Sequence, residues 1–266
     1  MKNCAVGVFD SGIGGLALVN ELNNLIPDEN IIYIADKLQV TDLLKDKETV
    51  LKYAEKNIDF LERHNVKMII SACGDVNTLF GVKPPETQTE YSGIFLPAAQ
   101  AACGATKNNK VGIIGSSSII KRGGYAKIIK NIKPGTLVTG VACPLLSNII
   151  ESGLTGKESN SLRQAAEKYF TVLKQEKVDT VILADGNYVV IRNIISDILG
   201  DSVTLISPYE ETAKHVYNCL LESDMLSDEG LPAQNKIYLT FDSDLYYRIS
   251  PFFLKRKNNI FEKVNL

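Results

Sequence analysis

Three short polar segments of the chain combine acid/base groups with glycine. They are Asp10-Ser11-Gly12-Ile13-Gly14-Gly15, Cys73-Gly74-Asp75 and Asp185-Gly186-Asn187, and each follows an apolar run. Carboxylates and thiols move protons, and a thiolate is a suitable base because its pKa lies within reach of neutrality. A cysteine at the end of a strand is otherwise a small buried apolar residue. The segments therefore predict either acid/base or nucleophilic chemistry at Cys73, or a structural role.

The glycines of the first segment also allow a second interpretation. Gly12, Gly14 and Ala17 fit the pattern G-x-G-x-x-A, and Asp36 ends the next apolar run. This is the outline of a dinucleotide-binding unit. The pattern is short, however, and Asp10 and Ser11 precede the glycines, where their side chains would crowd a pyrophosphate. A nucleotide cofactor is therefore the weaker interpretation.

The elements that position these segments alternate between strand and helix. Near-continuous apolar runs are typical of parallel strands covered on both faces. Amphipathic segments between them, such as 50–64, 162–176 and 191–198, predict helices. The alternation predicts a doubly wound α/β fold with parallel-rich sheets. The expected strands are 5–10, 31–36, 67–73, 93–97, 110–115, 136–143, 179–185, 203–207 and 236–241.

The two halves of the chain resemble each other in two places. Residues 6–11 are similar to residues 111–116, and residues 69–75 are similar to residues 181–187. The likeness predicts two related α/β units, although short β-rich strings also match by chance. Ligands of such sheets bind beyond the carboxyl ends of the strands. The polar or thiol residues at these ends are Asp10, Asp36, Cys73, Ser116, Cys143 and Asp185.

Composition excludes several classes of protein. Of the 266 residues, 45% are hydrophobic and 23% charged, which is ordinary for a globular chain. A formal net charge of -2 gives no general reason to bind nucleic acid or an anionic membrane. No apolar run is long enough for a membrane span or a signal peptide. Five scattered cysteines without a CxxC pair argue against a disulfide framework or a zinc site. We therefore expect a cytoplasmic protein that binds neither nucleic acid nor membrane.

The chain closely resembles the glutamate racemases along nearly its whole length. The opening 6–16 and the motif Ala142-Cys143-Pro144-Leu145-Leu146 carry the most specific likeness. The other matching segments and residues are 27–33, Asp36, 71–73, Ile120, Gly123, Tyr125, Glu151, Gly153, 181–183, Tyr188 and the tail 237–266, which resembles the family's closing strand and helix.

The resemblance implies an activity and an architecture. The family moves the α-proton of an amino acid with two cysteines, one per domain, without a cofactor, and is linked to peptidoglycan. The first cysteine corresponds to Cys73, with Asp10 as its acidic partner and Ser11 near the substrate. The implied fold has two α/β domains related by pseudo-symmetry around a cleft, residues 1–97 plus 208–266 and residues 98–207. A homodimer is also implied.

The second half-site departs from the family. Where the family has Gly-Cys-Thr-His-Tyr, this chain has Ala184-Asp185-Gly186-Asn187-Tyr188, so Asp185 replaces the cysteine and Asn187 the histidine. A carboxylate with a pKa near 3.9 is a weaker base than a thiolate near 8.5 by roughly 4.6 units, or on the order of 6 kcal/mol. Burial recovers part of that difference. We expect Asp185 to face Cys73 across the cleft.

The residues expected to anchor substrate have changed as well. Gly74 and Asp75 stand where the family has Asn-Thr, and Asp42 lies where it has Pro-Tyr-Gly. With Asp10, Asp36, Asp185 and Glu151, the site should be acidic and should favour an amine-bearing or neutral ligand over glutamate; no spacing demands a metal. Three alternatives stay open: a repurposed proton-transfer enzyme, an inactive homologue that binds a small molecule or regulates, and an unusual racemase still acting on an acidic amino acid.

Overall fold

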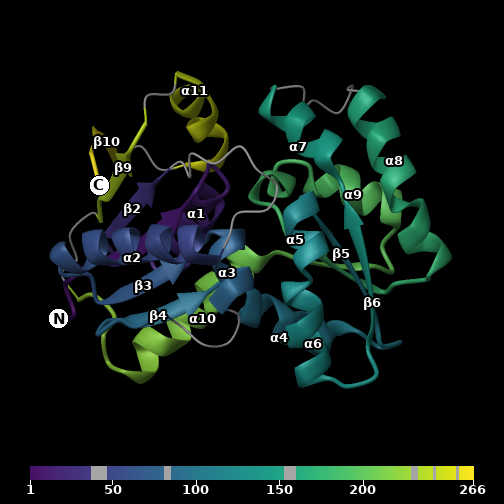
Figure 1. Ribbon diagram of the computed structural model, residues 1–266, viewed down its shortest axis with the longest axis horizontal. Coiled ribbons are helices and arrows are strands. Elements are labelled where there is room, and N and C mark those ends of the chain that lie inside the picture. The colour runs from purple at the N-terminus through teal and green to yellow at the C-terminus, as the bar shows by residue number, and fades with distance from the viewer. Residues whose placement is uncertain (37–46, 81–84, 153–159, 229–232, 242–243, 256–257) are drawn as a thin grey trace. The chain divides into compact units, whose positions relative to one another are not determined.

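The computed structural model describes residues 1–36, 47–80, 85–152, 160–228, 233–241, 244–255 and 258–266 (Figure 1). By its internal contacts the chain divides into two compact units. Unit 1 consists of Met1–Ile94 and Thr212–Leu266, and unit 2 consists of Phe95–Glu211. Each unit is built on its own parallel sheet.

Unit 1 holds a six-stranded sheet with the order β10-β9-β2-β1-β3-β4. Its strands are β1 (Val6–Asp10), β2 (Ile31–Ala35), β3 (Met68–Ser71), β4 (Glu90–Gly93), β9 (Asn235–Leu239) and β10 (Asn259–Lys263). Its helices are α1 (Gly15–Leu25), α2 (Lys47–Arg63), α3 (Gly74–Phe80), α11 (Asp244–Phe253) and most of α10 (Pro208–Glu222), which begins at the end of unit 2.

Unit 2 holds a four-stranded sheet with the order β6-β5-β7-β8. Its strands are β5 (Lys110–Gly115), β6 (Leu137–Ala142), β7 (Thr180–Leu183) and β8 (Thr204–Ile206). Its helices are α4 (Phe95–Ala105), α5 (Ser117–Arg122), α6 (Gly124–Ile132), α7 (Pro144–Glu151), α8 (Asn160–Gln175), α9 (Arg192–Leu199) and the 3₁₀ turn η1 (Gly186–Val189).

The two sheets share a strand order. In unit 1, β1 pairs with β2 on one side and β3 on the other, and β4 follows β3. In unit 2, β5 pairs in the same way with β6 and β7, and β8 follows β7. The segments that resemble each other in sequence are thus β1 with β5 and β3 with β7, in equivalent positions. The predicted fold class, two parallel α/β domains, is confirmed.

The central strands are buried on both faces, which explains their uninterrupted apolar sequences. Every residue of β1, β3 and β7 is buried. The helices are instead amphipathic: α2 buries Val50, Ala54, Ile58 and Leu61 at helical spacing and exposes much of its charged remainder. Among the described residues no helix combines the length and apolar character needed to cross a membrane.

The strand expected at residues 93–97 is wrong. The strand is β4, which ends at Gly93, and α4 begins at Phe95. Alanines at 98, 99, 101 and 102 favour helix, and Pro97 is tolerated because it lies in the first helical turn, where its missing N–H needs no partner. Burial misled the interpretation, since Phe95 and Ala98 are buried in the helix as they would be in a strand.

The tail of the chain ends differently from the family-based expectation of a strand followed by a helix. After β9 and α11 comes a further strand, β10, at the edge of the sheet. Only Ile260 and Phe261 are apolar in its five residues, and none of the five is buried. An edge strand of this kind has no apolar run to mark it in sequence.

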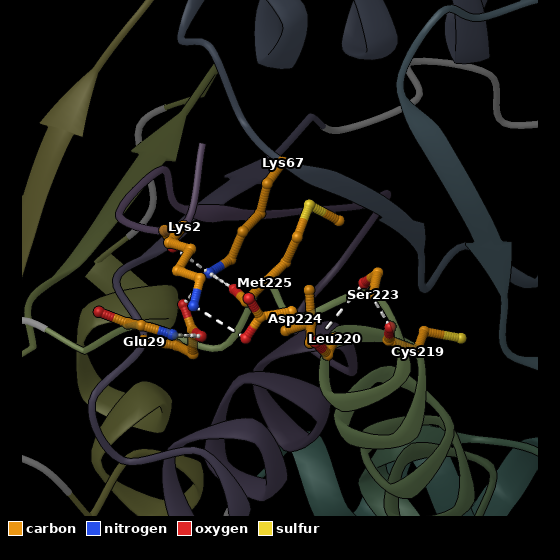
Figure 2. Close-up of polar contacts among 9 residues, drawn as sticks. Lys2, Glu29, Lys67, Cys219, Leu220, Ser223, Asp224 and Met225 are labelled. Atoms are coloured by element: carbon orange, nitrogen blue, oxygen red, sulfur yellow. Dashed lines mark hydrogen bonds and ion pairs between the residues drawn. The ribbon is translucent and has the colours of Figure 1, made fainter.

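A buried ion pair joins distant segments of unit 1 (Figure 2). Lys67 Nζ lies 2.6 Å from Glu29 Oε2, and the two side chains are 0% and 2% exposed. The same ammonium donates to the carbonyl oxygens of Lys2 and Met225, the latter at 2.8 Å. Glu29 Oε1 also accepts from the Ser227 N–H at 2.7 Å. The pair thereby connects the start of the chain, the segment after α1, the start of β3 and the end of α10.

Candidate functional site

Asp10 is the best-anchored carboxylate of unit 1. It ends β1 and is 7% exposed. Its Oδ1 accepts from the Ser11 N–H at 2.8 Å and its Oδ2 accepts from the Gly15 N–H at 2.8 Å, at the start of α1. A carboxylate at a helix N-terminus is stabilised by the backbone donors and the helix dipole. Asp10 is therefore held in one orientation beside the other predicted residues.

Close packing explains the glycine at position 15. A Cβ there would lie 2.8 Å from Asp10 Cβ and 2.8 Å from Tyr33 Cε2, closer than real side chains approach. Tyr33 in turn donates its hydroxyl to the Gly12 carbonyl oxygen at 2.9 Å. A Cβ at Gly12, by contrast, would meet nothing within 4 Å. The glycine-rich turn is thus shaped around Asp10 and Tyr33.

Cys73 lies between the end of β3 and the start of α3, 1% exposed. Its thiol donates to Ser11 Oγ at 3.4 Å. Burial, and then the charge of Asp10, raises the pKa of Cys73 to about 11, although the bonds to Ser11 and the Val76 N–H act in the opposite direction. At neutral pH the group is therefore a thiol. The structure brings together Asp10, Ser11 and Cys73, as the sequence predicted for the first half-site.

Asn77, which sequence reasoning missed, fixes the backbone around Cys73. Its Nδ2 donates to the Ser71 carbonyl oxygen at 2.9 Å and to that of Cys73 at 2.8 Å. Its Oδ1 occupies the space that a side chain at Gly93 would need. Asn77 is 3% exposed and lies one helical turn after Cys73. The i, i+4 spacing was the available signal.

Asp36 acts as a link between elements. Its Oδ1 accepts from Thr240 Oγ1 at 2.6 Å, and its Oδ2 accepts from Asn57 Nδ2 at 3.2 Å. Its N–H donates to the Asp10 carbonyl oxygen at 3.0 Å. These bonds connect the end of β2 with α2 and with the end of β9. Its predicted contact with a ligand stays a prediction.

Tyr53 shows that the acidic groups of unit 1 gather in one place. Burial, followed by the charges of Cys73, Asp10, Asp36 and Asp75, raises the pKa of its phenol. Its hydroxyl is buried and has no hydrogen-bond partner among the described residues. Asp75 and Gly74 occupy the first turn of α3, each partly exposed. Three carboxylates therefore lie near the Tyr53 phenol, and two of them, Asp10 and Asp75, also act on the Cys73 thiol.

Asp185 follows β7 in unit 2 and caps η1. Its Oδ1 accepts from the Asn187 N–H at 3.0 Å, and its Oδ2 accepts from Ser147 Oγ at 2.7 Å. Burial raises the pKa of Asp185, and the two hydrogen bonds oppose that rise. The side chain stays partly exposed, whereas Gly186 and Asn187 are buried. The carboxylate is thus held by two donors, one on each oxygen.

Among the described side chains, two titratable groups face Asp185. Burial, and then the charge of Asp185, raises the pKa of the Cys143 thiol to about 12. Burial also raises the pKa of Tyr188, whose hydroxyl donates to the Cys143 carbonyl oxygen at 3.4 Å. Both groups are neutral at neutral pH. No salt bridge to Asp185 is found among the described residues.

Two predicted site residues have undescribed side chains. Asp42 lies outside the described residues, and Glu151 ends α7 with its side chain outside them. Within the described part of the chain, no group of three or more His, Cys, Asp or Glu side chains could hold a metal ion. The sequence also missed Ser147, although it lies four residues after Cys143 just as Asn77 lies four after Cys73.

Known proteins resemble this chain both in sequence and in structure. The chain is 32% identical to the glutamate racemase of Oceanobacillus iheyensis over 249 residues, 92% of this chain and 90% of that protein. The structure is similar to that of a glutamate racemase isoform from Bacillus anthracis, with a TM-score of 0.90, 26% identity and coverage of 100% and 99%.

A second solved structure is a glutamate racemase from Francisella tularensis in complex with D-glutamate. Its TM-score is 0.87 at 26% identity, and the match covers 100% of this chain and 98% of that one. No protein-family model matches the chain. A relative above 30% identity across nine-tenths of both chains, together with these two folds, is decisive. The chain belongs to the glutamate racemase family.

Proposed function

We propose that this protein is a cofactor-independent, racemase-type isomerase that moves a proton at a carbon acid, using Cys73 and, in place of the second family cysteine, Asp185. The observation that carries the proposal is topological. Cys73 follows β3 and Asp185 follows β7, and these two strands hold equivalent positions in the four-strand order that the two sheets share. A group that ends one of these strands is the counterpart of a group that ends the other. We expect the two to act on opposite faces of one ligand.

The two groups differ in their resting protonation. The pKa of Cys73 is raised to about 11, so the thiol carries its proton and is an acid. Asp185 accepts hydrogen bonds through both oxygens, which favours the ionised form, and it is then the base. A carboxylate base is weak, but the raised pKa of Asp185 narrows the gap to a carbon acid. One acid and one base suit proton removal from one enantiomer better than from the other.

The charge of the site supports a ligand other than glutamate. Asp10 and Asp75 act on Cys73 in unit 1, Asp36 joins them around Tyr53, and Asp185 adds a carboxylate to the second half-site. A second carboxylate on the ligand would be repelled by them. We therefore propose an amine-bearing or neutral amino acid as the substrate, with a homodimer in the cytoplasm as the working form.

A second candidate is a non-catalytic homologue that binds or senses a small molecule. The burial of Cys73, 1% exposed, together with its high pKa, favours this candidate, since little thiolate exists at neutral pH. Such a homologue keeps the scaffold and binds the ligand but does not transfer a proton. The two candidates differ in whether the α-hydrogen of a ligand ever leaves carbon.

Hydrogen exchange in deuterium oxide separates the candidates. Neutral and basic amino acids of both configurations are incubated with the protein, and α-deuterium is measured by NMR. We expect exchange in one enantiomer ahead of the other, lost in Cys73→Ala and Asp185→Asn. Exchange that survives both substitutions contradicts the proposed residues. Binding without exchange favours the non-catalytic candidate, and fast conversion of L- to D-glutamate that needs Cys73 contradicts the proposed substrate preference.

A further inference from the structure

Ser147 makes the shortest contact to the Asp185 side chain among the described hydrogen bonds. Its Oγ donates to Asp185 Oδ2 at 2.7 Å, and the Asn187 N–H donates to Oδ1 at 3.0 Å. A carboxylate with one donor on each oxygen cannot rotate without breaking a bond. Each oxygen keeps a second lone pair for another donor. Ser147 therefore limits Asp185 to one orientation and leaves it able to accept from a ligand.

The start of α7 explains why Ser147 can make this contact. Pro144 opens the helix, and Leu146 and Ile150 are buried in the core, which fixes the helix against the sheet. A serine inside a helix commonly bonds to the carbonyl oxygen four residues earlier. For Ser147 that residue is Cys143, whose carbonyl oxygen accepts from the Tyr188 hydroxyl at 3.4 Å. The Ser147 hydroxyl reaches across to η1 instead.

The groups around Asp185 determine how strongly the hydrogen bond from Ser147 affects its ionisation. Within the described part of the chain, the titratable groups that face Asp185 are Cys143 on the α7 side and Tyr188 in η1, and both are neutral at neutral pH. The ionised form is favoured by hydrogen bonds from Ser147 and from the Asn187 N–H. Asn187 acts through its backbone, which no substitution removes easily. Ser147 is therefore the side chain whose substitution can change the pKa of Asp185.

We propose that Ser147 is a positioning residue that keeps Asp185 ionised and oriented for the ligand, an inference that rests on the proposed function of Asp185. It predicts a measurable effect even in a protein without turnover. Loss of a hydrogen bond to a charged group should raise the Asp185 pKa by about one pH unit. The matched comparison is Ser147→Thr, which retains a hydroxyl. A second control is Ser118→Ala, since Ser118 bonds the Ser116 hydroxyl at 3.0 Å and, among the residues that the structure describes, bonds no carboxylate.

The experiment is a carbon-13 NMR titration of the aspartate carboxyl groups in the full chain, with the Asp185 signal assigned by its absence from Asp185→Asn. We expect an upward pKa shift in Ser147→Ala, a near-native value in Ser147→Thr and no change in Ser118→Ala. An unchanged value in a folded Ser147→Ala overturns the inference. If Ser147→Ala fails to fold, Ser147→Cys, with its weaker donor, must show the same upward shift or the inference falls.

Activity then tests the proposed function separately. Where the wild type catalyses α-deuterium exchange, Ser147→Ala should move the acidic limb of the rate profile to higher pH, and Ser147→Thr should restore it. An unmoved limb contradicts a positioning role in catalysis. A wild type without exchange contradicts the proposed function, whereas the NMR titration still decides whether Ser147 controls Asp185.

Discussion

The Sγ atom of Cys73 lies 3.4 Å from Ser11 Oγ. This hydrogen bond lowers the pKa of the thiol, but burial and the charge of Asp10 raise that pKa by more. The pKa of Cys73 rises from 9.0 in the ordinary thiol to about 11 in the folded protein. The folded state thus keeps this proton at a pH where the unfolded chain has lost it. Stability from Cys73 is therefore complete below about pH 9 and is lost as the pH rises toward 11.

Cys73→Ala should remove this pH dependence. Between pH 8 and pH 11 the wild type should lose up to about 3 kcal/mol more unfolding free energy than the variant does. Urea denaturation at a series of pH values measures the difference. Thr78→Ala, on the adjoining helix α3, is the control and should change the stability without changing its slope against pH. Parallel curves for the wild type and Cys73→Ala would contradict the raised pKa.

Gly15 and Gly12 should respond differently to alanine. Gly15→Ala forces a Cβ against Asp10 and Tyr33, so we expect a loss of about 1–3 kcal/mol in the free energy of unfolding. Gly12→Ala meets open space and should change it by about 0.5 kcal/mol or less. Equilibrium denaturation of the two variants tests the packing of the turn. Equal losses would show that the backbone conformation, and not the close approach, requires glycine.

The buried and the exposed ion pairs of unit 1 provide a matched comparison. Lys67→Met leaves Glu29 charged and buried, and should cost about 3–5 kcal/mol. Lys52→Met breaks the exposed pair with Glu48, whose side chains are 68% and 74% exposed, and should cost about 0.5 kcal/mol or less. Adding Glu29→Leu to Lys67→Met should recover part of the loss. Similar effects of the two lysine substitutions would contradict this difference in burial.

Ligand charge can be tested without an assay for turnover. Neutral or basic amino acids should raise the melting temperature at fixed ionic strength, and dicarboxylates should not, because Asp10, Asp36, Asp75 and Asp185 are acidic. A ligand at about 100-fold excess over its dissociation constant adds about 2.7 kcal/mol. The double variant Asp75→Thr, Asp185→Cys should gain stabilisation by glutamate. If glutamate stabilises the wild type and neutral or basic amino acids do not, the acidic-site argument is contradicted.

Much of the fold and half of the candidate site followed from local sequence. Apolar runs marked the buried strands, because a parallel strand covered on both faces needs apolar residues on both sides. Polar residues just after those runs marked the carboxyl ends, which located Asp10, Cys73 and Asp185. The replacement of a cysteine by Asp185 was also legible in the sequence, because its neighbours retained the family pattern.

Other features depended on contacts between distant segments. Thr240 bonds Asp36 from 204 residues away, and Ser147 bonds Asp185 from 38 residues away. No local pattern encodes such a pair, because each partner is acceptable alone and only the packing of its element brings the atoms together. The same holds for residues 95–105. Their burial fits either a strand or a helix, and only the end of strand β4 at Gly93 shows that they form a helix. Sequence therefore determined which groups could do chemistry, and tertiary structure decided which partners hold them and in which protonation state.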